Sequence, residues 1–183
     1  SVVLAIELSL DLAHVNRLPV RFICGDVFAG RRPDPVLQQI EDFDDGTVSA
    51  NDCFRPVTRY FDRISRPEHL LTALPRALRT MTDPTDCGPV CLAFCQDVQA
   101  EAHDYPVDFF EPRVWRIRRP EPDPVEVAAV VAAIEAAKAP VIVAGGGVLY
   151  SGADDLLADF ATRRNIPIVE TQAGKGATSF EHA

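Results

Sequence analysis

The feature that most constrains the fold is the run VIVAGGGVLYSGA at 141–153. A short apolar segment meets three consecutive glycines, and a helical pattern follows. A buried strand that passes through a glycine turn into a helix is typical of a parallel α/β layer, because glycine lets the backbone pass close to the sheet. We therefore expect a strand at 141–144, a helix capped by Ser151 and a second strand at 166–171.

Strands and helices also alternate in the first part of the chain. The apolar runs LPVRFIC at 18–24 and GPVCLAF at 88–94 predict strands, and RYFDRI at 59–64 is a candidate for a further short strand. A short helix is expected at 36–43. A longer one is expected to run from the N-cap Ser65 to Thr82, because Pro67 and Glu68 follow the cap at the spacing of a capping box. The fold class is therefore α/β, with parallel sheets flanked by helices.

A proline-rich segment separates the two alternating regions. Prolines at this density keep a segment extended and break helices, and the segment 99–124 contains five of them: Pro106, Pro112, Pro120, Pro122 and Pro124. We therefore expect a first domain over 1–111, a linker over 112–123 and a second domain over 124–183.

The charge and the cysteines restrict the partners. A net charge of −9 repels nucleic-acid phosphates and anionic lipids, so neither nucleic acid nor membrane is expected as a partner. The apolar N-terminal run is interrupted by Glu7 and Asp11 and predicts a helix, with no sign of a signal peptide. The five cysteines lack paired zinc spacings, and their odd number without an export signal indicates reduced thiols in the cytoplasm.

The glycine run does not complete either common phosphate-binding motif. A dinucleotide fingerprint read from Gly145 needs glycine where Tyr150 stands, and a phosphate loop read from Gly147 needs lysine where Ala153 stands. Two interpretations stay open. The glycines shape a structural turn, or they keep a nucleotide or phosphate contact at the start of a helix.

Two further segments follow expected strands and carry the same ambiguity. Gly174, Lys175 and Gly176 lie past the strand at 166–171, where open α/β sheets place ligands, so Lys175 either meets an anion or lies in a solvated loop. Asp26 follows the strand at 18–24 and is either a site carboxylate or a turn residue that accepts hydrogen bonds from backbone amides. None of the four histidines pairs with another at metal-ligand spacing.

Several stretches together resemble thiamine-diphosphate-dependent enzymes. The similarity implies the last part of a pyrimidine-binding domain, a linker, and the first part of a Rossmann-like central domain. It covers nearly the whole chain and rests on the stretches at 13–20, 25–29, 34–71, 88–110 and 139–153.

A finer resemblance is to the trihydroxycyclohexane-1,2-dione hydrolases, the ring-opening enzymes of inositol catabolism. It rests on QDVQAEAHDYPVDFFEPRVWRIRRP at 96–120 and ETQAGKGA at 170–177. The resemblance implies a small-molecule substrate, a cyclic dione derived from a polyol, and a homo-oligomeric enzyme. There are two alternatives. The first is an acetolactate-synthase-like relative, which the stretch QAEAHDYP argues against, and the second is a non-catalytic α/β module.

The resemblance also implies which parts of the chemistry lie elsewhere. In the family, thiamine diphosphate is held through Mg²⁺ by a GDG motif and a later asparagine, and a glutamate activates the cofactor. No GDG occurs in this chain, and the glutamate lies upstream of the region that residue 1 matches. No catalytic residue and no metal ligand can therefore be assigned, and neither thiamine diphosphate nor Mg²⁺ is expected to bind this chain alone.

The resemblance assigns candidate positions at two places. It implies that Gly25, Asp26 and Val27, together with Gln38 in the following segment, line the active site at a dimer interface. In the central domain, which holds FAD in some relatives and is empty in others, the contacts to a nucleotide would come from Gly145, Gly146, Gly147, Gly174, Lys175 and Gly176.

Overall fold

A computed structural model describes residues 2–30, 42 and 44–179, and the chain divides into two compact units. Unit 1 is Ser1–Arg118 and unit 2 is Arg119–Ala183. Each unit contains a parallel sheet with flanking helices, as the fold class predicts. The division lies within the proline-rich segment at 112–123.

Unit 1 is built on a three-stranded parallel sheet in the order β1-β3-β2. The central strand is β3 (Val90–Cys95), flanked by β1 (Arg21–Asp26) and β2 (Tyr60–Ile64). In register, Asp26 lies opposite Cys95 at the carboxyl end of the sheet. All three strands therefore end at one edge, where loops from different parts of the chain meet.

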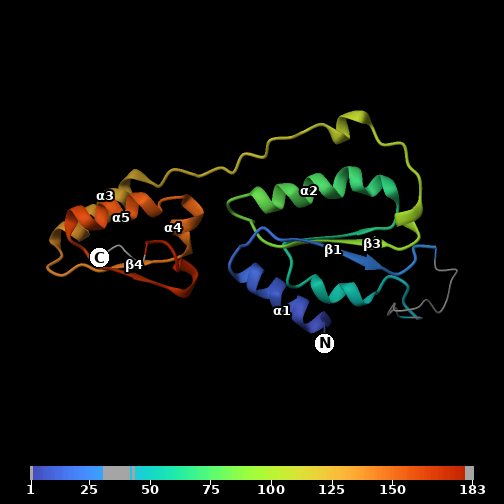
Figure 1. Ribbon diagram of the computed structural model, residues 1–183, viewed down its shortest axis with the longest axis horizontal. Helices are drawn as coiled ribbons and strands as arrows, with labels where there is room; N and C mark the ends of the chain where they lie inside the picture. Colours follow the sequence, from blue (N-terminus) through green and yellow to red (C-terminus); the bar gives the residue numbers. More distant parts are fainter. Residues whose placement is uncertain (1, 31–41, 43, 180–183) are drawn as a thin grey trace. The chain divides into compact units, whose positions relative to one another are not determined.

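Helices cover both faces of this sheet (Figure 1). The helix α2 (Leu70–Thr82), preceded by the 3₁₀ turn η2 (Pro67–His69), packs on one face, where Ala73 and Ala77 are completely buried. The small alanine side chains allow a close approach to the sheet. The core between them consists of Ile64, Ala73, Ala77, Val90, Leu92, Cys95 and Val98.

The opposite face is covered by α1 (Val2–Val15) and the 3₁₀ turn η1 (Ala50–Phe54). Leu10, Phe54 and Cys91 form the buried centre of this second cluster. Phe22 of β1 meets the Phe54 ring edge-on, with 4.9 Å between the ring centroids. Val90 and Leu92 thus face α2 and Cys91 faces α1 and η1, which is the alternation expected of a strand buried on both faces.

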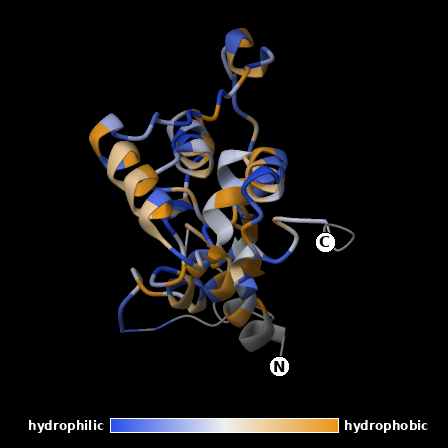
Figure 2. Ribbon diagram, turned by 90° about the vertical axis from the view of Figure 1, so that its left-hand side faces the viewer, coloured by the Kyte–Doolittle hydropathy of each residue, from blue (hydrophilic) through white to orange (hydrophobic). Residues whose placement is uncertain are grey.

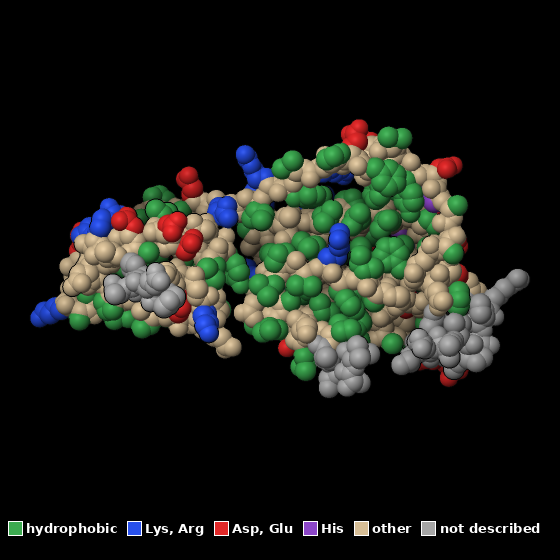
Figure 3. Space-filling view, viewed as in Figure 1, with side chains coloured by type: hydrophobic (Ala, Val, Ile, Leu, Met, Phe, Trp, Pro, Cys, Tyr) green, Lys and Arg blue, Asp and Glu red, His purple; other side chains and the backbone are tan. Residues whose placement is uncertain are grey.

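The segment after β3 is mostly extended, as its prolines predict. It contains two short 3₁₀ turns, η3 (Val98–Ala100) and η4 (Val107–Phe110). Tyr105, Phe109 and Phe110 contact one another through their rings. Figure 3 shows hydrophobic side chains spread over much of the side of unit 1 that faces the viewer.

The described residues of unit 2, 119–179, form two parallel strands and three α-helices. The helix α3 (Pro124–Ala136) leads to β4 (Ile142–Ala144), which pairs with β5 (Ile168–Glu170), and the short helix α4 (Gly146–Ser151), α5 (Asp154–Arg164) and the turn η5 (Gln172–Gly174) complete the unit. The Asp123 side chain caps α3 by accepting hydrogen bonds from the amides of Val125 and Glu126.

Figure 2 shows that apolar residues are concentrated in the strands and helices, whereas the connecting loops are largely hydrophilic.

Two expected helix caps are wrong. The cap before η2 is Arg66 rather than Ser65, because Pro67 forces the residue before it into an extended conformation. Ser151 does not begin a helix but ends α4, where its hydroxyl donates to the Gly147 carbonyl oxygen at 2.7 Å. The helix α4 starts immediately after Gly145, and the left-handed residue Gly152 stops it.

Two expectations concern residues at or beyond the limits of the description. The helix expected at 36–43 falls almost entirely outside the described residues. The apolar N-terminal run does form the helix α1, and within the part of the chain that the structure describes no helix is both long and apolar enough to cross a membrane.

Candidate functional site

The carboxyl edge of the β1-β3-β2 sheet brings three separate segments together. Gly25 and Asp26 end β1, and Val27 follows directly. The segment 47–52 lies against this end of β1, because the Asn51 side-chain amide donates to the Gly25 carbonyl oxygen at 2.7 Å. This edge is therefore a crowded junction rather than a free end of the sheet.

Arg63 of β2 connects the segments. Its Nε donates to the Asp26 carboxylate, its Nη1 to the Thr47 carbonyl oxygen at 2.9 Å, and its Nη2 to the Ser49 hydroxyl at 2.7 Å. The same Nη2 lies 3.3 Å from a carboxylate oxygen of Asp52. One guanidinium thus links β1, β2 and the loop 47–52, using the planar fork of donors that only arginine offers.

Asp26 is buried, with 1% of its side chain exposed. One carboxylate oxygen meets Arg63, and the other accepts from the Val27 amide at 2.9 Å. Of the two interpretations of Asp26, these contacts favour a residue that holds the turn, because both oxygens are directed at protein donors.

Asp97, just after β3, fixes the continuation of β1. Its two carboxylate oxygens accept from the amides of Ala29 and Gly30 at 2.9 and 2.8 Å. Desolvation raises the pKa of Asp97, but the amide hydrogen bonds from Gly30, Ala29 and Val98 outweigh it and lower the pKa below the ordinary value. The Asp97 carboxylate therefore holds the segment that follows Val27 to the end of β3.

The electrostatics of Arg63 and Asp52 follow from the same contacts. Desolvation lowers the pKa of the guanidinium, whereas the hydrogen bond and charge of Asp26, followed by those of Asp52, raise it above its ordinary value. Desolvation also raises the pKa of Asp52, but the Ser49 amide, Arg55 and Arg63 lower it overall. Both ion-pair partners therefore stay charged near neutral pH.

In unit 2, the two glycine segments meet at the carboxyl edge of β4 and β5. A Cβ atom at Gly174 would lie 2.2 Å from the Ala144 carbonyl oxygen, and one at Gly146 would lie 3.2 Å from the Ala173 carbonyl oxygen. These two glycines therefore let backbone pack on backbone. Gly145 and Gly147 meet no such backbone obstruction.

The loop after β5 is closed by a carboxylate. Glu170 accepts from the Thr178 amide at 2.9 Å and from the Gly176 amide at 3.3 Å. These backbone hydrogen bonds lower the pKa of Glu170. Gly176 has a φ of 92°, a conformation that glycine adopts without strain, and Lys175 is exposed beside it.

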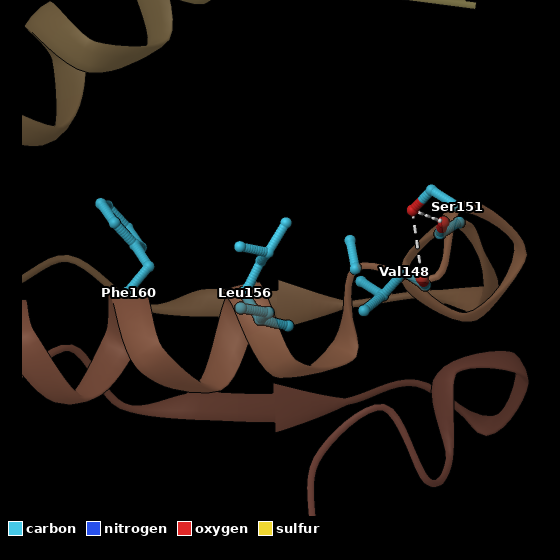
Figure 4. A pocket seen from close by; sticks show the side chains of 7 residues that line it. Val148, Ser151, Leu156 and Phe160 are labelled. Carbon is cyan, nitrogen blue, oxygen red and sulfur yellow. Dashed lines mark hydrogen bonds between the residues drawn. The ribbon is translucent and has the colours of Figure 1, made fainter. Parts of the chain in front are cut away.

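An open apolar hollow of about 360 Å³ lies between α4 and α5. Figure 4 shows Leu156 and Phe160 projecting from the same side of α5, with Val148 and Ser151 of α4 at the other end. The Ser151 hydroxyl is directed at carbonyl oxygens of its own helix. The hollow thus offers apolar contact area and little polar recognition.

The predicted site residues fall into two groups, one in each unit. Gly25, Asp26 and Val27 lie together at the edge of unit 1, and Gln38 lies outside the described residues. The glycines of the second group lie together at the edge of unit 2. Sequence analysis missed three residues that organise the first edge: Asn51, Arg63 and Asp97.

A signal for Arg63 was present in the sequence. A charged residue beside the buried end of a strand needs a partner, and Asp26 at the end of another strand supplies one. Asn51 and Asp97 carry no comparable signal, because turn residues of these types are common. Among the described residues, no group of three or more His, Cys, Asp or Glu side chains could hold a metal ion.

Comparison of the sequence with known proteins finds a matching family model and several similar proteins. The family model "Thiamine pyrophosphate enzyme, central domain" matches residues 127–183. The chain is 50% identical over 174 residues to a 3D-(3,5/4)-trihydroxycyclohexane-1,2-dione hydrolase of Geobacillus thermodenitrificans, a match that covers 95% of this chain and 27% of that protein. Proteins of the same name from Clostridium perfringens and Bacillus cereus are 50% and 49% identical over 93% and 95% of this chain, again with 27% of each relative covered.

The chain therefore spans about a quarter of the length of these relatives, and the similarity includes both units rather than the central-domain region alone. Residues 127–183 thus resemble the central domain of thiamine-diphosphate-dependent enzymes, and over 95% of its length the chain is similar to proteins named trihydroxycyclohexanedione hydrolases.

Proposed function

We propose that residues 1–183 are part of a thiamine-diphosphate-dependent hydrolase that cleaves a carbon–carbon bond of a cyclic dione in myo-inositol catabolism. The observation that carries the proposal is the 50% identity over 95% of the chain to proteins named for that substrate. An acetolactate-synthase-like activity would share the fold, but it lacks this support.

The proposal assigns each region a part of the parent enzyme. Residues 1–111 are the C-terminal part of a pyrimidine-binding domain, 112–123 the linker, and 124–183 the N-terminal part of the central domain. Two observations support these boundaries: the compact units divide between Arg118 and Arg119, and the central-domain match begins at residue 127.

The turn after β1 is the proposed lining of the active site. Gly25 is exposed and Val27 half-buried, so this turn lies at the surface of the sheet edge, whereas the Asp26 carboxylate is directed at Arg63. Asp26 and Arg63 accordingly act as positioning residues for the turn. Gln38 stays a second candidate for the lining.

Thiamine diphosphate and Mg²⁺ belong to the parent enzyme in this proposal. Among the described residues no group of three or more His, Cys, Asp or Glu side chains could hold a metal ion, so no residue of this chain is proposed as a Mg²⁺ ligand. When bound, the cofactor supplies an electron sink for cleavage beside a carbonyl. This chain contributes walls and positioning, and it is inactive in isolation.

A nucleotide, if the parent binds one, is proposed to lie at the carboxyl edge of β4 and β5. Packing accounts for Gly146 and Gly174, so the contacts fall to Gly145, Gly147, Lys175 and Gly176. The parent is further proposed to be a cytoplasmic homo-oligomer, since the resemblance places the active site at a dimer interface.

The experiment that tests the proposal uses the complete protein that contains residues 1–183. With thiamine diphosphate and Mg²⁺ present, it is expected to open the ring of 3D-(3,5/4)-trihydroxycyclohexane-1,2-dione and to form no acetolactate from pyruvate. Product formation from the two substrates is followed by mass spectrometry. Acetolactate formation without ring opening would contradict the assignment.

A further inference from the structure

Three cysteines share the face of the sheet that α1 and η1 cover. Cys91 of β3 is completely buried in that cluster, and Cys24 of β1 and Cys53 of η1 pack against it. None of the five cysteines, all of which lie in described residues, forms a disulfide. Nothing in the proposed function uses these thiols.

Cys24 and Cys91 stand out by their geometry. Their sulfur atoms are 3.6 Å apart, on neighbouring strands of the same sheet. Cys24 lies opposite Ala93 and Cys91 opposite Phe22, so the two cysteines are diagonal neighbours on one face. Closing the contact to the bond length of about 2.05 Å brings the sulfur atoms roughly 1.5 Å closer, and because diagonal neighbours lie about 7–8 Å apart, the backbone of β1 must move toward β3 as the bond forms.

The two thiols differ in access and in acidity. Cys24 is half-buried on the edge strand β1, whereas Cys91 is buried in the central strand. The hydrogen bond between them lowers the pKa of Cys24, against the opposing effect of desolvation. The same hydrogen bond, together with burial, raises the pKa of Cys91. Cys24 is therefore the thiol that a solution oxidant meets first, and Cys91 is the thiol beside it.

We propose that Cys24 and Cys91 are a redox-sensitive pair that a hydroperoxide converts to a disulfide between β1 and β3. The Cys24 sulfur attacks one peroxide oxygen, which gives the sulfenic acid and, with hydrogen peroxide, one water. The Cys91 sulfur then attacks the Cys24 sulfur, the S–O bond breaks, and a second water leaves with the Cys91 proton. Two thiols lose two electrons, and the peroxide gains them.

The bond would act on the edge of unit 1 directly. Cys24 precedes Gly25 and Asp26, so the bond would fix the end of β1 to the central strand. This inference does not depend on the proposed function, because it concerns the chemistry of the chain itself.

The test oxidises the folded 183-residue chain with hydrogen peroxide, blocks the remaining thiols by alkylation and maps the products by mass spectrometry. Trypsin separates Cys24 from Cys91, whereas Cys87, Cys91 and Cys95 stay on one peptide. Fragment spectra of the cross-linked peptides therefore identify the partner. The variants C87S and C95S are matched controls that remove the other thiols of that peptide.

The expected result is an intramolecular Cys24–Cys91 disulfide that persists in C87S, C95S and C53S, disappears in C24S, and is reversed by dithiothreitol. In C91A the sulfenic acid of Cys24 is expected to accumulate and to react with dimedone. If C91A does not fold, disulfide mapping of the unsubstituted chain still shows whether Cys24 bonds to Cys91. A dominant Cys24–Cys53 bond, an intermolecular bond, or a folded chain whose Cys24 resists peroxide would overturn the proposal.

Discussion

At the scale of single residues, Arg63 links several separate segments of unit 1, although it lies in a short strand. Its guanidinium contacts Asp26 and Asp52 and two groups of the loop between them. Since the Asp26 side chain is almost fully buried, removing its partner leaves an uncompensated charge in the protein interior.

The substitution Arg63→Met is therefore expected to lower the free energy of unfolding by about 3–5 kcal/mol. Chemical denaturation followed by circular dichroism measures the change. Arg66→Met is the matched control, because Arg66 is 72% exposed and lies 3.7 Å from Glu68, and its loss is expected to cost less than about 1 kcal/mol. Equal losses in the two variants would show that Arg63 is an ordinary surface arginine.

Gly174 and Gly147 provide a second contrast at this scale. Gly174→Ala places a Cβ atom 2.2 Å from the Ala144 carbonyl oxygen, so the variant is expected to lose about 2 kcal/mol or more and to displace β5. Gly147→Ala lies in a helix with open space around it and is expected to gain about 0.5–1 kcal/mol. Thermal unfolding measures both, and a tolerated alanine at 174 would contradict the close packing of the backbone.

At the scale of elements, the patterns of apolar residues predicted the strands and long helices, whereas the helix starts depended on local backbone conformation. The periodicity of Leu70 to Met81 predicts α2, and the apolar run at 88–94 predicts β3, because burial alone fixes both. The prediction that Ser65 caps a helix was wrong because the extended conformation before Pro67 decides where the helix begins. The prediction that Ser151 caps a helix was wrong because residues 146–151 form a short helix of their own.

The stability that Asp97 contributes by holding the end of β1 to β3 is predicted to depend on pH. The folded chain lowers the pKa of Asp97, so its contribution to stability is present above the ordinary carboxylate pKa and is lost as the pH falls through the folded value. Asp97→Asn is expected to cost about 0.5–1.5 kcal/mol at pH 7 and progressively less below about pH 4.

The comparison requires the free energy of unfolding of both proteins at each pH. Asp108→Asn, at an exposed position, serves as the control and is expected to change stability little at any pH. A loss in Asp97→Asn that is constant with pH would mean that the carboxylate charge does not stabilise the loop.

At the scale of the whole molecule, the sequence predicted which segments lie at the sheet edges, but not the contacts that hold them there. It placed Gly25, Asp26 and Val27 after a strand, and the glycine runs after two others, because parallel strands end at a common edge. It did not predict Asn51 or Arg63 as their supports, since those contacts join segments more than 25 residues apart in the chain.

The division into two units predicts where a protease cuts. The segment 113–118 is exposed except for the half-buried Trp115 and has no helix or strand, whereas Arg76 and Arg79 lie in α2. Limited trypsin digestion is therefore expected to cut after Arg116 or Arg118 before it cuts within α2, because cleavage needs locally unfolded backbone. Mass spectrometry identifies the order, and early cuts in α2 would contradict the division.

The central claim is that this chain supplies part of a thiamine-diphosphate enzyme and not its cofactor site. The most direct measurement is calorimetric titration of thiamine diphosphate with Mg²⁺ into the 183-residue chain and, in parallel, into the complete protein that contains it. The account predicts stoichiometric binding to the complete protein and no binding to the chain alone. Tight binding to the chain alone, or no binding to the complete protein, would contradict it.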